Sequence, residues 1–356
     1  MKQFIYKVLA LSLPIILLVI GINYFGDAAN VFDSEYEKKM VKIILNDKYV
    51  TNIQNYDERI FQEELISEIK FQPEIVIIGS SRTMLISSAF FSKQSLLNSS
   101  VSGAGLKDIT AIYQIYKSNN KIPKKIIIGI DPWLLNENNI QSRWLSISSY
   151  YNQFHHKKEI PFISHKRFKQ LFSLSYFQFS LKRLYKDLLE NTNPIPTNER
   201  FNKTNTKLTD GSLVYGFEFK NASSKEIEIR IQSYLNNKLY NIDDFRSISD
   251  KSWKEFVKVL DDMKNNGVEV ELFLAPYAPL VYNEILDNYP MVIRSEEKIR
   301  NLALSKNIRL YGSFNPFELN MDNSYFYDGM HCNEKGIEKV LNTITVKKQE
   351  KNQESE

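Results

Sequence analysis

The stretch EIVIIGSS, residues 74–81, decides the fold predicted for this chain of 356 residues. Its central residues, Ile75–Ile78, form an unbroken apolar run that ends at a glycine and two serines. Short runs of this kind are typical of strands that are buried on both faces, as in parallel sheets. A similar run follows at Ile126–Ile130, and further strands are predicted at Val268–Ala275 and Ile308–Tyr311. The sequence therefore predicts a central parallel sheet.

Amphipathic helices are predicted between these strands. Apolar residues recur at helical spacing over Leu106–Tyr116 and Val292–Ser305. The segment Ser252–Glu255 has the pattern of a capping box, and Gly267 closes the helix that follows it. A final helix is predicted over Ile337–Ile344. Strands that alternate with helices indicate an α/β three-layer sandwich, with helices on both faces of the sheet.

The alternation breaks over residues 133–249, which are rich in Tyr, Phe, Asn and Ser. We interpret this stretch as an insertion after the third strand, with a helix near Phe168–Leu189. Long insertions at the carboxyl ends of parallel strands usually shape the substrate site. The α/β domain is thus predicted over residues 71–346, after a connecting segment (29–70) and before a disordered charged tail (347–356).

A transmembrane anchor is predicted over residues 1–28. The segment Phe4–Phe25 is almost wholly apolar and, at about 20 residues, long enough to cross a ~30 Å hydrocarbon core. Lys2 and Lys7 lie at its start, and Asp27, Asp33 and Glu35 follow it, which favours a cytoplasmic N-terminus and an external domain. A cleaved signal peptide is the alternative. Both interpretations place the domain outside the cytoplasm.

Composition excludes several classes of protein. Hydrophobic residues make up 43% and charged residues 25% of the chain, which is typical of a globular domain. A net charge of +4 without a long Lys/Arg run gives no support for nucleic-acid binding. The single cysteine, Cys332, cannot form an intramolecular disulfide or a cysteine metal site. We expect neither a metal nor a cofactor.

Ser81 lies where the first strand ends. Open α/β folds place their sites at this edge of the sheet, and a serine there lies near backbone N–H groups that favour developing negative charge. The alternative is that the serine only caps a helix.

The segment Asp328-Gly329-Met330-His331 is the second candidate. His331 can accept a proton from a serine hydroxyl if an acceptor holds its other ring nitrogen. Asp328 can supply that acceptor from the same turn, and the apolar neighbours over residues 325–327 would exclude water. The alternative is a surface turn that caps a helix. A metal site is disfavoured, because no further His or Cys cluster accompanies the pair.

Together the two segments resemble the SGNH (GDSL-type) hydrolase superfamily. In that superfamily the serine follows Gly-Asp near the start, and Asp and His lie three residues apart near the end. Gly79-Ser80-Ser81 matches the first block, with Ser80 in place of the usual Asp. The resemblance implies that Ser81 is the nucleophile, His331 the general base and Asp328 the carboxylate that orients it.

The resemblance also implies an oxyanion hole made by the backbone N–H groups of Ser81 and Gly103. The third block, normally Gly-x-Asn-Asp, reads Gly129-Ile130-Asp131-Pro132 here. An ionised Asp131 would repel the oxyanion, and losing one donor costs roughly 3 kcal/mol. Either another group substitutes, or Asp131 is protonated or turned away, or the enzyme works slowly on an activated acyl donor. As a further alternative, Asp131 is only a turn residue before Pro132.

Three residues are weaker candidates for substrate binding. Arg82 could bind an anionic substrate or pair with a local carboxylate. Tyr277 follows a strand and could line the cleft or belong to a plain turn. Asp131 is the third.

The expected activity is that of a serine esterase or O-acyltransferase. The anchor and the altered blocks resemble the SGNH proteins of envelope-polymer acylation, such as those of teichoic-acid D-alanine transfer and alginate O-acetylation. This resemblance implies a cell-envelope glycan or acylated carrier as substrate, and a membrane-bound O-acyltransferase and the cytoplasmic membrane as partners. The alternatives are a plain carbohydrate or lipid esterase, and an inactive glycan-binding or scaffold protein on the same fold.

Overall fold

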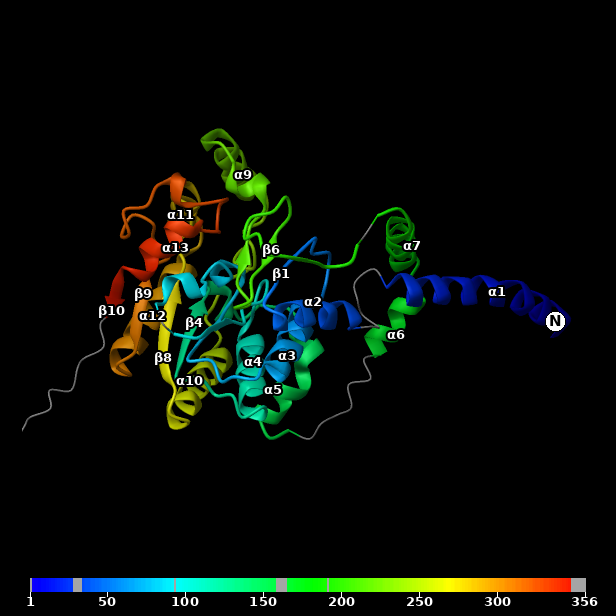
Figure 1. The fold of residues 1–356 in the computed structure, drawn as a ribbon, viewed down its shortest axis with the longest axis horizontal. Coiled ribbons are helices and arrows are strands. Elements are labelled where there is room, and N and C mark those ends of the chain that lie inside the picture. The colour runs from blue at the N-terminus through cyan, green and yellow to red at the C-terminus, as the bar shows by residue number, and fades with distance from the viewer. Residues whose placement is uncertain (1, 28–33, 93, 158–164, 191, 347–356) are drawn as a thin grey trace, which may run out of the picture.

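The computed structural model describes residues 2–27, 34–92, 94–157, 165–190 and 192–346. They form an α/β domain from which one long N-terminal helix projects (Figure 1). The predicted tail lies outside these residues.

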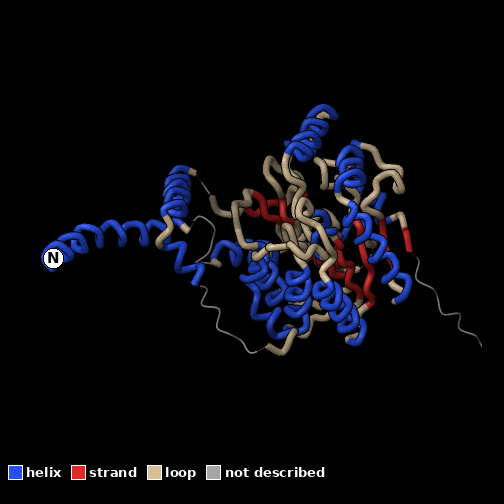
Figure 2. The backbone as a smooth tube through the Cα atoms, turned by 180° about the vertical axis from the view of Figure 1, so that it is seen from behind, coloured by secondary structure: helices blue, strands red, loops and turns tan. Residues whose placement is uncertain are grey.

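The central sheet has six strands in the described part of the chain. In spatial order they are β10 (Ile344–Val346), β9 (Arg309–Gly312), β8 (Glu269–Leu274), β4 (Lys125–Ile130), β2 (Ile75–Ile78) and β3 (Leu96–Asn98). Five pair in parallel, and β10 adds an antiparallel edge. Helices lie on both faces (Figures 1 and 2). The predicted α/β architecture around a parallel sheet is confirmed.

The order of the strands contains a switch point between β2 and β4. From β2 the chain moves outward to β3, and then returns to form β4 on the other side of β2. In open α/β sheets ligands bind beyond the carboxyl ends of the strands at such a point. Ser81 follows β2 and Asp131 follows β4, so both begin at this edge.

The helices of this domain differ from the prediction at their ends. They are α4 (Leu106–Ser118), α10 (Asp250–Asn265), α11 (Pro279–Asn288), α12 (Pro290–Ser305) and α13 (Glu334–Leu341). The capping box predicted at Ser252 is wrong, because Ser249 caps α10 and its side chain accepts the Ser252 N–H at 3.2 Å. Ile344, expected in the last helix, lies in β10 instead.

Residues 35–68 belong to the domain, so the predicted connecting segment is wrong for them. They form α2 (Glu35–Leu45), β1 (Tyr49–Thr51) and α3 (Glu58–Glu68). Phe61 and Leu65 of α3 are fully buried in the same core as the central strands.

The predicted insertion has its own secondary structure. Its elements are α5 (Ser148–Phe154), α6 (His165–Leu171), α7 (Leu174–Leu189), β5 (Ile195–Thr197), β6 (Thr206–Lys207), β7 (Leu213–Val214), α8 (Phe217–Lys220) and α9 (Ser224–Asn236). Three of its strands join β1 in a second sheet of order β5-β1-β6-β7. The single helix expected near 168–189 is two helices, because Ser173 caps α7 by accepting the Tyr176 N–H.

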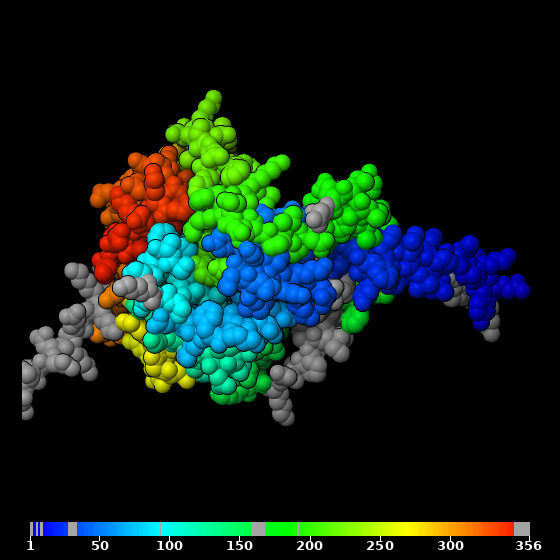
Figure 3. All heavy atoms as spheres, in the orientation of Figure 1, coloured from blue at the N-terminus to red at the C-terminus, as the bar shows by residue number. Residues whose placement is uncertain are grey.

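The N-terminal helix α1 (Lys2–Gly26) projects from the domain and lies against α6 and α7 (Figures 1 and 3). The Asn23 side chain donates to the carbonyls of Gln170 (2.9 Å) and Leu171 (2.8 Å), which fixes the end of α1. Among the helices described, none is both long and apolar enough to cross a membrane. The predicted transmembrane span therefore has no support in the structure.

Glu37 of α2 is a buried carboxyl group. It is 1% exposed, and its Oε1 accepts the Asp57 N–H at 2.6 Å. Burial raises the pKa of Glu37 to about 7, although the backbone hydrogen bond opposes the rise.

We predict that Glu37→Gln removes part of the pH dependence of stability. Between about pH 4.5 and 7 the folded state holds a proton at Glu37 that the unfolded state has lost, so the free energy of unfolding falls as pH rises. The full effect is about 3 kcal/mol. The free energy of unfolding in urea should differ less between pH 5 and pH 7.5 for Glu37→Gln than for the parent chain. An equal difference in the two chains would contradict the raised pKa of Glu37.

Candidate active site

Ser81 opens a short 3₁₀ turn, η1 (Ser81–Thr83), just beyond β2. Ser80, not Ser81, caps this turn, because its Oγ accepts the Arg82 N–H at 3.2 Å. The strands below are tightly packed: a Cβ added to Gly79 would lie 3.0 Å from the Cα of Gly129. Ser80 therefore has the capping role that was an alternative for Ser81, and the Ser81 hydroxyl can bond to another partner.

Asp328 and His331 lie on one turn before α13. The Asp328 carboxylate accepts the backbone N–H groups of Met330 (2.8 Å) and His331 (2.9 Å). The Tyr327 N–H donates to the His331 carbonyl at 2.9 Å and closes the turn. The same carboxylate therefore holds both the backbone and the imidazole of His331.

The structure brings the three residues together across 250 positions of sequence. The Ser81 Oγ lies 2.9 Å from His331 Nε2, and His331 Nδ1 lies 2.8 Å from Asp328 Oδ2. Burial raises the pKa of Asp328, but the charge of His331 and the hydrogen bonds outweigh it and leave that pKa below its ordinary value. An ionised Asp328 keeps the Nδ1 proton in place, so Nε2 faces the serine as an acceptor.

Arg82 lies behind the triad and is not available to substrate. It is 2% exposed, and its Nη1 donates to Asp131 Oδ1 at 3.0 Å. Its Nε donates to the Met330 carbonyl at 3.0 Å, and Nη2 donates to the carbonyls of Ala275 and Pro276. The prediction that Arg82 binds an anionic substrate is wrong, because buried partners take up its guanidinium.

Tyr277 and Asp131 belong to the same buried group. Tyr277 is fully buried, with its ring centroid 4.1 Å from Arg82 Cζ, so it packs on the guanidinium and does not line a cleft. Burial raises the pKa of the Asp131 carboxyl, while Arg82 and the Ser80 hydroxyl oppose the rise. Of the alternatives for Asp131, the structure shows a buried carboxyl group that pairs with Arg82 Nη1 at 3.0 Å. Its expected role in substrate binding is therefore also wrong.

The loop that carries Gly103 is clamped from two sides. Glu58 accepts the Ser102 N–H and, at 2.9 Å, the Ser102 hydroxyl, while Arg59 Nη2 donates to the Ser102 carbonyl at 2.9 Å. Gly103 has a φ of +55°, which favours glycine. Within the described residues no hydrogen bond is formed by the N–H groups of Ser81 and Gly103.

A cavity of about 790 Å³ opens at Ser81. Ser102, Arg143, Lys203 and Tyr215 line it together with the serine. The Tyr215 ring lies 6.3 Å from the His331 ring, centroid to centroid. The insertion therefore contributes residues to the wall of the cavity at Ser81.

Sequence reasoning missed several lining residues. Glu58 and Arg59 come from α3, which lies in the segment predicted as a connection. Arg143 begins a 3₁₀ helix, η4 (Arg143–Ile147), and Lys203 lies in a loop; neither belongs to a motif. The spacing of apolar residues at Ile60, Phe61, Leu65 and Ile69 does predict a short helix there, which α3 confirms, and the Asp57 side chain caps it.

No set of three or more His, Cys, Asp or Glu side chains is grouped to hold a metal ion in the described part of the chain. Comparisons of the sequence with protein-family models and with curated proteins find no match.

We predict that Arg82→Met lowers the free energy of unfolding by about 3–5 kcal/mol, because it leaves the buried Asp131 carboxylate without its counter-charge. Denaturant unfolding measures the change. Lys124→Gln is the matched control: its side chain is 77% exposed in an ion pair with Glu74, and we expect a change below about 1 kcal/mol. Equal effects of the two substitutions would contradict the role given to Arg82.

Proposed function

We propose that this chain is a serine esterase or O-acyltransferase of the SGNH type. The observation that carries the proposal is the continuous hydrogen-bonding path from Ser81 Oγ to His331 Nε2 (2.9 Å) and from His331 Nδ1 to Asp328 Oδ2 (2.8 Å). Its position at the switch point of the sheet supports the same conclusion, as does the cavity that opens at Ser81.

In the first half of the proposed reaction, the Ser81 hydroxyl attacks the carbonyl carbon of an acyl ester. His331 Nε2 accepts the hydroxyl proton, and Asp328 stabilises the imidazolium that forms. The N–H groups of Ser81 and Gly103 are the donors proposed for the oxyanion of the tetrahedral intermediate. Cleavage of the ester bond then transfers the proton from His331 to the leaving alcohol and leaves the acyl group on Ser81.

In the second half, a hydroxyl compound enters and gives its proton to His331. Its oxygen attacks the acyl carbon, the bond between that carbon and Ser81 Oγ breaks, and His331 returns the proton to Ser81 Oγ. With water the product is a free acid, and with a sugar hydroxyl it is a new ester. Because the triad acts identically in both cases, the proposal covers both hydrolysis and acyl transfer. The proposed substrate is an acyl ester of a cell-envelope glycan.

We also propose that the chain attaches to a membrane, with a membrane-bound O-acyltransferase as a candidate partner. Membrane attachment is supported by the exposed apolar side chains of α1, such as Leu11 (75% exposed), Ile15 (64%) and Leu18 (59%). Exposed apolar surface of this extent favours contact with lipid.

We predict that a fluorophosphonate probe labels the parent chain at Ser81. Ser81→Ala should lose the label and at least about 10³-fold of its ester hydrolysis, since no other hydroxyl lies against His331 Nε2 among the described residues. Ser80→Ala, which removes the neighbouring hydroxyl, should keep the label. Labelling that persists in Ser81→Ala would refute the assigned nucleophile, and an unlabelled, inactive parent chain would favour a binding protein.

For membrane attachment, we predict that the full chain sediments with vesicles of phosphatidylethanolamine and phosphatidylglycerol. Replacing Leu11 and Leu18 of α1 by Asp should lower the bound fraction at least about tenfold, because each substitution places a charge in the apolar surface. Leu286→Asp on α11, where the leucine is 50% exposed, is the matched control and should bind normally. A full chain that stays in the supernatant would contradict the proposal.

A further inference from the structure

The helix α7 presents an apolar face to solvent. Its apolar residues recur at helical spacing, so they form one stripe along the helix. We call this the α7 stripe, and its members are Leu174, Phe177, Leu181, Leu184, Tyr185 and Leu188. Tyr185 is 65% exposed and Leu188 is 84% exposed. Contiguous apolar surface of this kind marks a contact with another molecule or with a membrane.

A different face of α7 packs against α1. The Tyr176 hydroxyl donates to Asp27 Oδ1 at 2.7 Å, and Arg183 Nη1 donates to the Asp27 carbonyl at 2.8 Å. A Cβ added at Gly26 would lie 2.8 Å from the Cβ of Ser180, so the two helices meet closely there. α7 is therefore fixed to the end of α1 while the α7 stripe is left exposed.

The net positive charge of the chain lies in this same region. Of the 46 Lys and Arg and the 42 Asp and Glu residues of the chain, residues 165–190 hold six and two, which leaves 40 of each elsewhere. The two acids, Asp187 and Glu190, are each paired with a cation of α7. Lys169 of α6 and Lys182 of α7 are exposed and form no ion pair in the described part of the chain.

Charge and apolarity together indicate an anionic bilayer as the partner of α7. Helices with Leu, Phe and Tyr on one face and lysines on the other lie in the interface of such bilayers. The apolar side chains enter the acyl region, and the lysines reach the lipid phosphates. Figures 1 and 2 show α7 running across the base of α1, on the side of the domain from which α1 projects. A bilayer that receives the apolar surface of α1 would therefore meet α7 as well.

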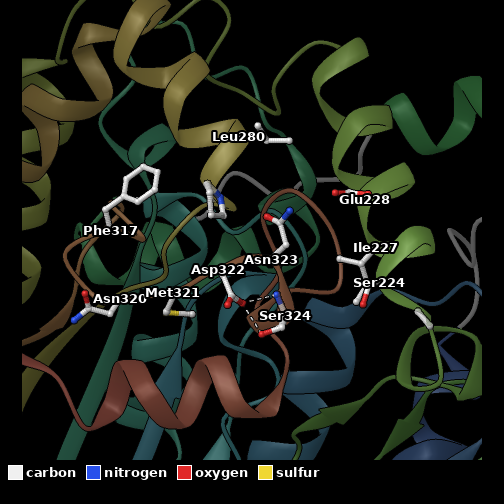
Figure 4. A pocket seen from close by; sticks show the side chains of 12 residues that line it. Ser224, Ile227, Glu228, Leu280, Phe317, Asn320, Met321, Asp322, Asn323 and Ser324 are labelled. Carbon is white, nitrogen blue, oxygen red and sulfur yellow. Dashed lines mark hydrogen bonds between the residues drawn. The ribbon is translucent and has the colours of Figure 1, made fainter.

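Another exposed apolar surface of the molecule has the opposite charge. Figure 4 shows Leu280 and Phe317 around a depression of about 850 Å³, together with the carboxylates of Glu228 and Asp322. An anionic bilayer would repel these acids. Of the two surfaces, α7 is the one that combines apolar and cationic groups.

We propose that the α7 stripe is a membrane-binding surface that lies in the interface of an anionic bilayer, with Lys169 and Lys182 on the lipid phosphates. Two points of contact, α1 and α7, hold the domain against the bilayer in one orientation, whereas α1 alone would let it turn about the helix axis. The inference extends the proposed membrane attachment through other residues, and it is independent of the acyl-ester chemistry.

The first test locates α7 in vesicles of phosphatidylethanolamine and phosphatidylglycerol. The full-length chain with Leu188→Cys is labelled with the fluorophore NBD and reconstituted in these vesicles; Cys332 is buried and should stay unlabelled. We expect nitroxide-labelled lipid to quench the NBD emission at least about twofold and aqueous iodide to have little effect. The matched control is Glu228→Cys, at an exposed position of α9, which should show the reverse.

The second test measures the contribution of charge. It uses the chain with the two α1 substitutions given above, in which attachment through α1 is weakened. Adding Lys169→Gln and Lys182→Gln should lower the remaining affinity for these vesicles at least about fivefold, and should have no effect where phosphatidylcholine replaces phosphatidylglycerol. Lys124→Gln with Lys251→Gln removes the same charge from two exposed lysines elsewhere and should leave the affinity unchanged.

The outcomes separate this inference from the proposed function. A Leu188 probe that iodide quenches and lipid does not, in a chain that binds vesicles, would refute the inference and leave attachment through α1 standing. Equal effects of the two lysine pairs would also overturn it. NBD emission that rises as the chain is concentrated without vesicles would instead place a second copy of the chain on the α7 stripe. A full chain that binds no vesicles would overturn both this inference and attachment through α1, without bearing on the labelling of Ser81.

Discussion

The buried guanidinium of Arg82 is the interaction on which the active edge of the molecule depends. It joins Asp131 at the end of β4, the carbonyls of Ala275 and Pro276 at the end of β8, and the carbonyl of Met330 in the loop of the histidine. A buried charge of this kind is stable only when all its partners are in place. The position of His331 opposite Ser81 is therefore coupled to the packing of three parallel strands.

This arrangement also accounts for the unusual residues at the strand ends. A carboxylate after β4 would repel an oxyanion, but Asp131 is paired with Arg82 and contacts the Ser80 hydroxyl. Ser80, Arg82 and Asp131 thus form one electrically balanced unit behind the serine. Ser81, as the first residue of its turn, keeps its hydroxyl for His331.

The walls of the site come from parts of the chain outside the parallel sheet. Glu58 and Arg59 of α3 clamp the loop of Gly103. Tyr215, two residues before α8, and Phe219 within α8 line the cavity at Ser81. The sheet and the loops that carry Ser81 and His331 position the triad. The added segments set the shape and charge of the cavity at Ser81. In the proposed function, these added segments would set the substrate preference more than the core fold does.

The sequence by itself determined the elements whose signal is local. Apolar runs identified β2 and β4, since a strand buried on both faces needs no polar alternation. A three-residue spacing was enough to pair Asp328 with His331 on one turn. The tertiary structure alone decided the partner of Arg82, which lies 49 positions away, and the burial of Tyr277. It also decided that α2 and α3 belong to the domain and that Ile344 joins a sheet edge. Such pairings depend on distant segments meeting in space, so no periodicity or local spacing in the chain reports them.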